Sequence, residues 1–327
     1  MIHYLNKDFY HPRHYLNQWF LQDTLIVTDL DIKKCELDQS NNRYHSESMS
    51  QWLHEHPCKN VVVDVSQNCF VPDLIPDCLQ GKPTLTSMYN QWYHQSAPTN
   101  YFLPVWMYMF SQRNTAVGLA HFTDAHRFDT PGTKTQGAMC LNRGGRSHRI
   151  KFYKLMENYQ DKMCLTVPVH PDLPWQTNRL SGDTVDFNGL PPNDVGVDHS
   201  VYNQYAVNVV TETQIDHPSL SEKSCKPFIA RQIPVIVGNA GVNQFHVDIG
   251  FDMFEDLIPW RTWDNQDNQD IKLEKIAEFV KQWIDSGTIL KDYRQVHDRV
   301  ECNKQYFHSE RFRDLIMKTM PKINPYQ

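Results

Sequence analysis

The sequence lacks an apolar run long enough to cross a membrane. Its longest apolar run covers residues 101–110, whereas a membrane helix needs about 20 apolar residues. The N-terminus, MIHYLNKDFYHPRHYL, lacks the basic segment followed by an apolar segment that marks a secretory signal. These absences predict a cytoplasmic protein that makes no contact with a membrane.

Patterns of disulfide and metal binding are missing as well. None of the eight cysteines forms a CxxC pair, and several lie within apolar runs, as reduced core cysteines do. The HExxH pattern does not occur among the sixteen histidines. Asp124 and His126 would share one face of a strand, but two ligands do not complete a zinc site. We therefore expect no metal centre built by the protein.

The chain also has no excess of basic residues. It contains 32 Lys and Arg against 38 Asp and Glu, a formal net charge of −6. Proteins that bind duplex DNA usually carry a basic surface, so a glycan or a small metabolite is the preferred partner. The basic segment 143–154 keeps DNA open as an alternative. A hydrophobic content of 40% argues against a disordered chain.

The length of 327 residues exceeds one typical hydrophobic core, so two domains are expected. The first covers residues 1–132 and the second residues 135–288, with a Pro- and Gly-containing linker between them. The Pro-, Asp- and Asn-rich segment 170–203 is predicted to be a long loop. Residues 289–327 are predicted to be helical, and they either cross back to the first domain or pack on the second.

The first half alternates between strand and helix patterns, which predicts an α/β domain. Short apolar runs predict strands at 25–30, 60–65 and 101–110. Helices are predicted between these runs, at 48–56 and 83–95. In the second half, residues 270–287 show the apolar spacing of an amphipathic helix that ends at a glycine.

Residues 206–254 carry the most informative pattern, which is strand, short helix, strand, glycine turn and helix. The first β-branched run ends at Glu212, and the second, 233–237, ends at Gly238-Asn239-Ala240-Gly241. Ser221-Glu222-Lys223 lies between them at a predicted helix start. Parallel strands joined by helices bind ligands beyond their carboxyl ends. These three groups of residues are therefore expected to converge there.

The chemistry of this convergence suits a nucleoside diphosphate. Ser221 is a good N-cap, and the start of a helix attracts a phosphate group. Lys223 adds a positive charge beside it. Glu222 only accepts hydrogen bonds, so it suits the paired hydroxyls of a ribose. Pro227 removes a backbone donor inside the helix, which predicts that the helix is short or kinked.

A second basic element lies upstream, where a short strand at 138–141 leads into a turn and a helix capped by Ser147. Arg143, Arg146 and Arg149 cluster around this turn, and arginine forks match phosphate oxygens. Three solvated arginines at a helix start would give the same pattern. The second strand–helix–strand unit makes phosphate binding the better interpretation.

These residues carry a resemblance. The triplet SEK followed by PVIVG resembles the donor-binding motif of α-1,3-fucosyltransferases. The longer segment SEKSCKPFIARQIPVIVGNAGVNQFHVDIGFDMFEDL resembles phage, giant-virus and bacterial glycosyltransferase-like proteins, and CLNRGGRSHRIKF is similar to their upstream arginine motif. The resemblance covers residues 137–257 and leaves the N-terminal third without a match.

The resemblance implies a glycosyltransferase with two Rossmann-like α/β domains facing across a cleft, the GT-B arrangement. It implies a nucleotide-diphosphate sugar as donor substrate, and magnesium stays open because it binds a diphosphate through few protein ligands. Arg146, Arg149 and Lys223 would neutralise the diphosphate as it leaves. The donor-binding residues expected are Arg143, Arg146, Arg149, Ser221, Glu222, Lys223, Gly238, Asn239 and Gly241.

An inverting enzyme also needs a general base for the acceptor hydroxyl. Asp64 is the first candidate because it ends the clearest strand of the first half, and the others are Asp29, Asp124 and His126. A carboxylate at a strand end also often caps a neighbouring helix or loop. Glu212, which resembles the glutamate before the family triplet, would face the sugar or the acceptor.

The acceptor and two other classes stay open. A glycan or a small molecule is preferred, and hydroxymethylated DNA is the alternative that the phage resemblance supports, with the host cytoplasm as location if the chain is viral. A non-catalytic nucleotide- or sugar-binding module is a further alternative. A nucleotide-sugar epimerase is disfavoured, because no G-x-x-G-x-x-G turn occurs near the N-terminus.

Overall fold

The computed structural model describes five short strands before residue 103 by their backbone, and then residues 133–142, 145–166, 199–212, 215 and 220–319. Within the later ranges, the side chains of residues 199, 200, 222 and 317–319 are not described. The chain divides into two compact units, which are taken one at a time below. One contains residues 1–105 with 315–327, and the other contains residues 106–314.

The first unit contains a five-stranded sheet in which neighbouring strands are all parallel and follow the order of the sequence. The strands predicted at 25–30 and 60–65 are confirmed, and the one predicted at 101–110 is described only at its start. The strands are β1 (Ile2–Tyr4), β2 (Thr24–Thr28), β3 (Asn60–Asp64), β4 (Thr84–Thr86) and β5 (Asn100–Phe102).

The helix predicted at 83–95 is wrong at its beginning, because Thr84–Thr86 is strand β4. Its two threonines are β-branched, and β-branched residues favour strands. The helix predicted at 48–56 lies outside the described residues. The sequential strand order has no reversal, so these five strands contain no switch point of the doubly wound kind.

The second unit contains a four-stranded parallel sheet in the order β7-β6-β8-β9. Its order reverses between β6 and β8, because the chain runs from β6 outward to β7 and then returns to β8. Ligands of open α/β sheets bind beyond the carboxyl ends of the strands at such a point. The strands are β6 (Gln136–Cys140), β7 (Cys164–Leu165), β8 (Tyr205–Thr211) and β9 (Ile233–Val237).

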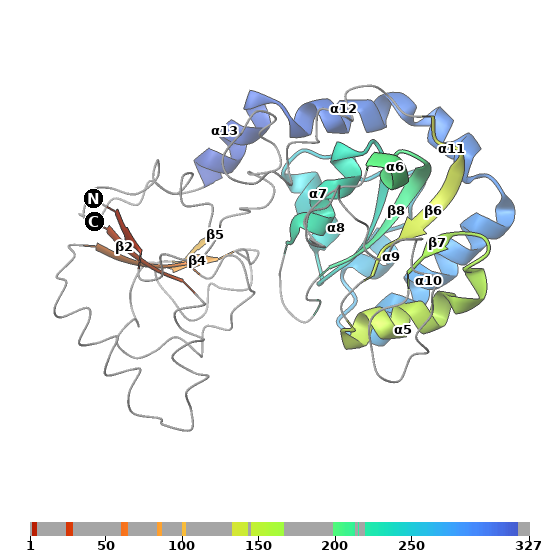
Figure 1. Cartoon of the computed structure of the whole chain (residues 1–327), viewed down its shortest axis with the longest axis horizontal. Helices are drawn as coiled ribbons and strands as arrows, with labels where there is room; N and C mark the ends of the chain where they lie inside the picture. The colour runs from red at the N-terminus through yellow and green to blue at the C-terminus, as the bar shows by residue number, and fades with distance from the viewer. Residues whose placement is uncertain are drawn as a thin grey trace. The chain divides into compact units, whose positions relative to one another are not determined.

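Helices cover this sheet on two sides. Figure 1 shows α7 and α8 on one side of it and α5 and α10 on the other. These helices are α5 (Ser147–Met156), α7 (Glu222–Ile229), α8 (Val242–Asp248) and α10 (Gln269–Ser286). The other helices among the described residues are η6 (Glu157–Tyr159), α6 (His199–Tyr202), α9 (Arg261–Asp264), α11 (Ile289–Gln295), α12 (His297–Phe307) and α13 (Glu310–Thr319).

The central strands of this sheet are apolar on both faces, as strands of a covered parallel sheet are. In β8, Val207 and Val209 on one face and Ala206 and Val210 on the other are all buried. Pro234 pairs with Asn208 in β9, the last strand of the sheet. An edge strand tolerates proline because its outer side needs no backbone donor. The predicted strand–helix–strand order of this region is confirmed.

Three further predictions can be compared directly with the structure. The amphipathic helix predicted at 270–287 is α10, which begins after the cap Asn268 and ends at Gly287, whose φ is 66°. The loop predicted at 170–203 contains α6 in its last residues, and residues 170–198 lie outside the described part. The helix predicted to be short because of Pro227 is α7, which has 8 residues.

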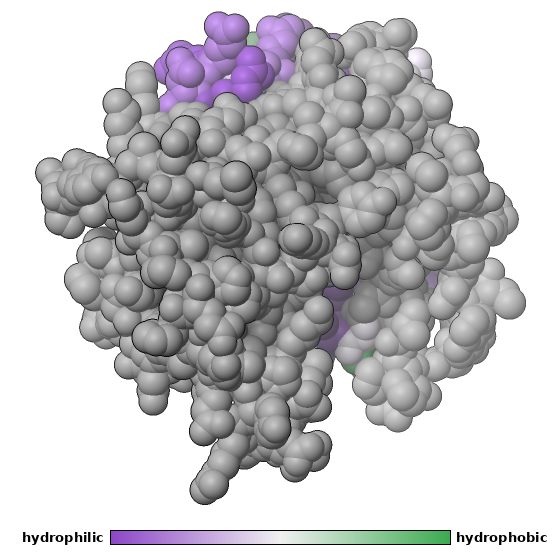
Figure 2. All heavy atoms as spheres, turned by 60° about the vertical axis from the view of Figure 1, so that its left-hand side comes forward, coloured by the Kyte–Doolittle hydropathy of each residue, from purple (hydrophilic) through white to green (hydrophobic). Residues whose placement is uncertain are grey.

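An aromatic cluster joins the last helices of the second unit to its core. The rings of Phe228 and Phe251 stack with centroids 4.1 Å apart, and Phe307 and Phe312 close the cluster. Burying such a ring contributes about 1.5–3 kcal/mol. Figure 2 shows a group of hydrophilic residues at the top of the face that it presents. The exposed residues at the start of α13, Glu310 and Arg311, are charged.

Candidate functional site

The switch point between β6 and β8 is closed by polar contacts. Asn142, which follows β6, is buried, and its Oδ1 accepts a hydrogen bond from the hydroxyl of Thr211 at the end of β8. The backbone of Asn142 exchanges two hydrogen bonds with the hydroxyl of Thr166, at 2.6 and 2.8 Å. The carboxyl ends of β6, β7 and β8 are thus held together by one buried asparagine.

The start of α5 is fastened to the end of β8. His148 Nε2 lies 2.9 Å from the carbonyl oxygen of Glu212. Arg149 Nη2 donates to the carbonyl oxygens of Thr211 and Glu212, at 3.2 and 3.1 Å. Both side chains are buried. Arg149 therefore has a structural role at this edge, and phosphate binding by its guanidinium stays a prediction.

The structure describes Arg146 but not Arg143, the other two arginines of this motif. Arg146 is exposed and has an extended backbone directly before the first residue of α5. Arg143 lies outside the described residues. The expectation that Ser147 caps α5 is wrong, because Ser147 is the first residue of the helix and Arg146 occupies the cap position without a side-chain hydrogen bond. The backbone donors of this helix start are therefore not taken up by a local serine.

Glu212 is fully buried and its carboxylate meets the start of α7. It accepts hydrogen bonds from the backbone N–H of Ser221, at 3.2 and 3.3 Å, and from the hydroxyl of Ser221, at 2.5 Å. The hydroxyl of Ser224 also donates to it. The expectation was that Glu212 faces the sugar or the acceptor. The contacts described instead place this carboxylate inside the protein, where it orients α7.

The predicted cap of α7 is confirmed, since the Ser221 hydroxyl accepts a hydrogen bond from the backbone N–H of Lys223 at 3.3 Å. Lys223 itself is partly exposed at the first turn. The backbone of Glu222 begins the helix, and its side chain lies outside the description. Sequence reasoning missed Ser224, although its spacing of three from Ser221 places both on one helix face.

The glycine turn after β9 is tightly constrained. A Cβ at Gly238 would lie 3.1 Å from the Val242 side chain, and Gly241 has a φ of 76°, which favours glycine. Asn239 is buried, and its side-chain amide donates to the carbonyl oxygen of Ala240 at 2.6 Å. The predicted donor-binding residues of this turn therefore lie at the carboxyl edge of the sheet, with the Asn239 side chain turned onto its own backbone.

Two residues that sequence reasoning missed hold this turn. Asp264, at the end of α9, accepts hydrogen bonds from the backbone N–H groups of Asn243 and Gln244, at 3.1 and 3.0 Å. Lys272 donates to the carbonyl oxygens of Asn239 and Asp264, at 2.8 and 3.2 Å. Both side chains are almost completely buried. Burial lowers the pKa of Lys272 to about 8, and the charge of Asp264 opposes this shift.

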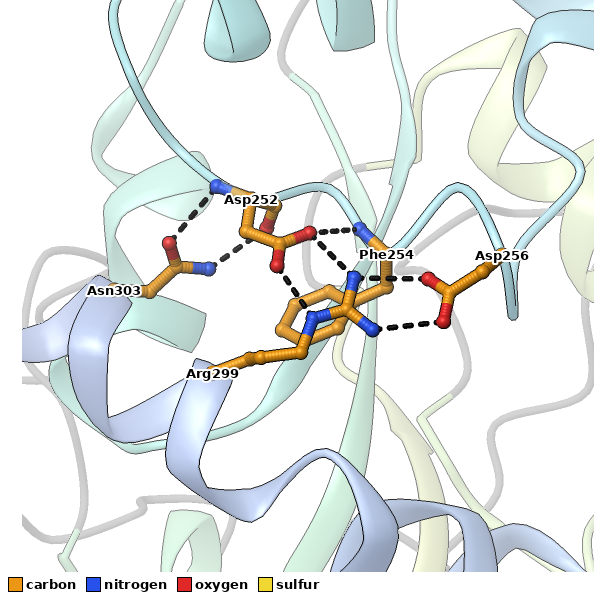
Figure 3. Close-up of polar contacts among 5 residues, drawn as sticks. All are labelled: Asp252, Phe254, Asp256, Arg299 and Asn303. Atoms are coloured by element: carbon orange, nitrogen blue, oxygen red, sulfur yellow. Dashed lines mark hydrogen bonds and ion pairs between the residues drawn. The ribbon is translucent and has the colours of Figure 1, made fainter.

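The segment that leads from α8 to α9 is fastened to α12, as Figure 3 shows. Arg299 binds both oxygens of Asp252, at 2.6 and 2.8 Å, and both oxygens of Asp256, at 2.8 Å each. Asn303 accepts from the backbone N–H of Asp252 and donates to its carbonyl oxygen. The guanidinium of Arg299 lies 5.0 Å from the centre of the Phe254 ring. The segment after α8 is therefore anchored to α12 through both its side chains and its backbone.

Another buried lysine lies at the opposite edge of the sheet. Lys134, just before β6, donates to the carbonyl oxygens of Tyr202 and Ala230, at 2.9 and 2.8 Å. Burial lowers its pKa to about 7, and the charges of Arg231 and Lys304 act in the same direction. These residues lie near the amino ends of the strands and are separate from the candidate site.

The part of the chain that the structure describes contains no group of three or more His, Cys, Asp or Glu side chains arranged to hold a metal ion. No helix in that part is both long and apolar enough to cross a membrane. Asp64, the first candidate base, is the last residue of β3, where it pairs with Thr28 of β2 and Leu85 of β4. Asp29, Asp124 and His126 lie outside the described residues.

Comparison of the sequence with protein-family models gives no match, and a search of curated proteins also gives none. Among solved structures, the chain is similar to a UDP-forming α,α-trehalose-phosphate synthase from Burkholderia xenovorans. The two share 12% sequence identity with a TM-score of 0.39, over 93% of this chain and 75% of the other. A similarity this distant gives no evidence about activity. The function is therefore inferred from the geometry of the site.

Proposed function

We propose that this protein is a glycosyltransferase that moves a sugar from a nucleotide-diphosphate donor to a hydroxyl of an acceptor. One observation carries the proposal. The Ser221-Glu222-Lys223 triplet, which resembles a nucleotide-sugar motif, begins α7 and is bonded to Glu212 directly after β8. It therefore lies at the carboxyl edge of the sheet next to the switch point, where α/β sheets bind nucleotides.

The contacts around β8 explain why two basic residues would meet one diphosphate. The start of α5 is held by the carbonyl oxygens of Thr211 and Glu212, and the start of α7 is held by the Glu212 carboxylate. The exposed Arg146 and the partly exposed Lys223 come from these two helix starts. The start of α5 has no side-chain cap, and an uncapped helix start favours an anion.

In this account the donor diphosphate binds between Arg146 and Lys223, and the two charges stabilise the leaving group as the glycosidic bond breaks. Glu222 binds the ribose hydroxyls. Glu212 is assigned a positioning role in place of the catalytic role expected from the sequence, because its carboxylate is engaged with α7. Magnesium, if used, would be held mainly by the diphosphate.

Asp64, in the first unit, stays the proposed general base. The proposed architecture is a GT-B arrangement of two domains. It ends the third of five parallel strands, with a paired strand on either side. The proposed acceptor is a glycan or a small molecule with a free hydroxyl, since the net charge of −6 does not favour DNA. Hydroxymethylated DNA is the alternative acceptor.

A transfer experiment tests the proposal. The purified protein is incubated with nucleotide sugars of several bases, together with glycans, small hydroxyl compounds and hydroxymethylated DNA, and the acceptors are searched for added sugar mass. Transfer to a glycan or small molecule supports the proposal, and transfer to DNA alone reverses the order of acceptors. Binding of a nucleotide sugar with no transfer and no hydrolysis would instead show a non-catalytic module.

Salt dependence separates the two acceptor classes independently of turnover. Binding to DNA through several phosphates falls steeply with salt, with a log–log slope of about −0.9 per contact. Binding to an uncharged glycan changes little. Lys223→Ala should slow donor-dependent transfer to either acceptor at least tenfold, whereas Lys291→Ala, an exposed lysine of α11, is the matched control.

A further inference from the structure

The helix starts at the carboxyl edge of the second-unit sheet are not equivalent. The start of α5 carries no side-chain cap, and the start of α7 is capped by its own Ser221. The start of α8 is different, because Gly241 occupies its cap position and has no side chain. Its backbone donors are instead satisfied by Asp264, which lies more than twenty residues along the chain.

The carboxylate of Asp264 accepts hydrogen bonds from the backbone N–H groups at the start of α8, so few donors remain there for a ligand. One oxygen accepts from the backbone and side-chain amides of Asn243, at 3.1 and 2.8 Å, and the other accepts from the backbone of Gln244, at 3.0 Å. Asp264 is 1% exposed. A negative charge is favoured at a helix start, and here the protein supplies that charge itself.

Lys272 balances this charge and ties the turn to α10. Its Nζ reaches the carbonyl oxygens of Asn239, inside the glycine turn, and of Asp264, at the end of α9. The backbone N–H of Gly241 also donates to the carbonyl oxygen of Asp264, at 3.0 Å. Asp264 and Lys272 thus hold the turn at Asn239 and Gly241 and the start of α8 at Asn243.

A cap that served stability alone would need only a local serine or asparagine, as Asn268 shows for α10. The arrangement at α8 instead buries a carboxylate and an ammonium group, and such burial is costly unless both are fully bonded. What this arrangement adds is a fixed position of the turn relative to α9 and α10.

We propose that Asp264 and Lys272 are positioning residues for donor binding, in that they fix the 238–241 turn and fill the α8 start with an internal anion. The start of α8 is thereby closed to the diphosphate of the donor, which leaves Arg146 and Lys223 as its proposed partners. This inference rests on the proposed function. Neither residue touches the donor, so both act through the shape of the turn.

The test compares the full-length protein with Asp264→Asn and Lys272→Met. Asp285→Asn is the matched control, because Asp285 also lies in a helix of this region but forms an exposed pair with Lys162. Amide hydrogen exchange is measured at Asn243 and Gln244, and the dissociation constants of UDP and GDP are measured by calorimetry well below the melting temperature.

In the Asp264→Asn variant, we expect the amides of Asn243 and Gln244 to exchange hydrogen at least tenfold faster than in the wild type. We also expect the variant to bind UDP or GDP at least tenfold more weakly. Exchange in β6 and α11 should stay as in the wild type, which separates a displaced turn from general unfolding. Asp285→Asn should change neither quantity. Should Asp264→Asn fail to fold, Lys272→Met gives the same comparison, because methionine keeps the length of the side chain and removes the ammonium group.

The two proposals fail in different ways. A wild-type protein that binds no nucleoside diphosphate overturns the proposed function and, with it, the role of the turn in donor binding. A wild-type protein that binds UDP or GDP, together with Asp264→Asn and Lys272→Met variants of equal affinity, overturns only the positioning role. A loss of affinity that is accompanied by equally faster amide hydrogen exchange throughout the second unit overturns the positioning role as well.

Discussion

The hydroxyl of Ser221 lies 2.5 Å from a carboxylate oxygen of Glu212, and this contact ties the start of α7 to the end of β8. A second hydroxyl, that of Ser224, donates to the same carboxylate. The carboxylate is completely buried. The proposed donor site is therefore built on a buried acid whose role is to orient the helix that carries Lys223.

Glu212→Gln should destabilise the protein, because the buried carboxylate accepts several charge-assisted hydrogen bonds that an amide cannot reproduce. The expected loss is about 1.5–3 kcal/mol in the free energy of unfolding, measured by urea denaturation. Glu278→Gln, on the exposed face of α10, is the control and should be nearly neutral. Equal stability of the two variants would show that the Glu212 contacts contribute little.

Lys223→Ala and Arg146→Ala should each weaken the binding of a nucleoside diphosphate without unfolding the protein. Each charged contact is expected to contribute about 1.5–3 kcal/mol, and both side chains are accessible enough to be lost without a cavity. Calorimetric titration with UDP and GDP measures the effect. The prediction is wrong if both variants bind as tightly as Lys291→Ala.

Arg149→Ala should lower stability as well as affinity, since Arg149 is buried and donates to the carbonyl oxygens of Thr211 and Glu212. Leaving buried carbonyl groups without this donor costs about 1–3 kcal/mol. Urea denaturation compares this variant with Arg294→Ala, whose arginine is exposed on α11. A fully stable Arg149→Ala variant would contradict the structural role given to this arginine.

Gly241→Ala and Gly287→Ala form a matched pair. Both glycines have a positive φ, 76° and 66°, and an added Cβ meets no atom within 4 Å at either position. Each variant should therefore lose about 1–2 kcal/mol from backbone strain alone. Only Gly241→Ala should also weaken nucleoside diphosphate binding, because only Gly241 lies in the turn beside the donor site. Equal affinities in the two variants would argue against a role of the turn.

His246 should make the stability of the protein depend on acid pH. It is completely buried, its Nδ1 lies 2.7 Å from the carbonyl oxygen of Val242, and burial lowers its pKa to about 4. Because the folded pKa lies below the unfolded value of about 6.5, unfolding takes up a proton between these values. Stability from this group is present above pH 6.5 and falls by up to about 3 kcal/mol as the pH drops towards 4.

Urea denaturation at several pH values between 4 and 7 measures this dependence. His246→Phe removes the titrating group and should flatten the pH dependence, whereas His297→Phe, at the partly exposed start of α12, should leave it unchanged. A wild-type profile with no slope between pH 4 and 6.5 would contradict the assignment.

Local sequence patterns predicted the elements that carry the site but not the contacts that hold it. Strands β8 and β9 follow from their β-branched runs, and the cap of α7 follows from Ser221, because each signal lies within a few neighbouring residues. Strand β4 was missed since its three residues are too short for a periodic pattern.

The buried role of Glu212 could not be read from the sequence, because a strand-end carboxylate looks the same whether it meets a ligand or a serine pair. Asp264 and Lys272 were missed for a related reason. Their partners in the glycine turn and at the start of α8 lie 20 or more residues away, and such contacts leave no local pattern. The one signal was Lys272 itself, which lies on the apolar stripe of α10 one turn before Ile276.

The most direct measurement of the proposed function is the release of nucleoside diphosphate from nucleotide sugars by the purified protein, with and without acceptors. The account predicts release by the wild type and by Lys291→Ala, and release at least tenfold slower by Lys223→Ala, whose lysine would neutralise the leaving diphosphate. Release from no nucleotide sugar, or equal release by Lys223→Ala and the wild type, would contradict it.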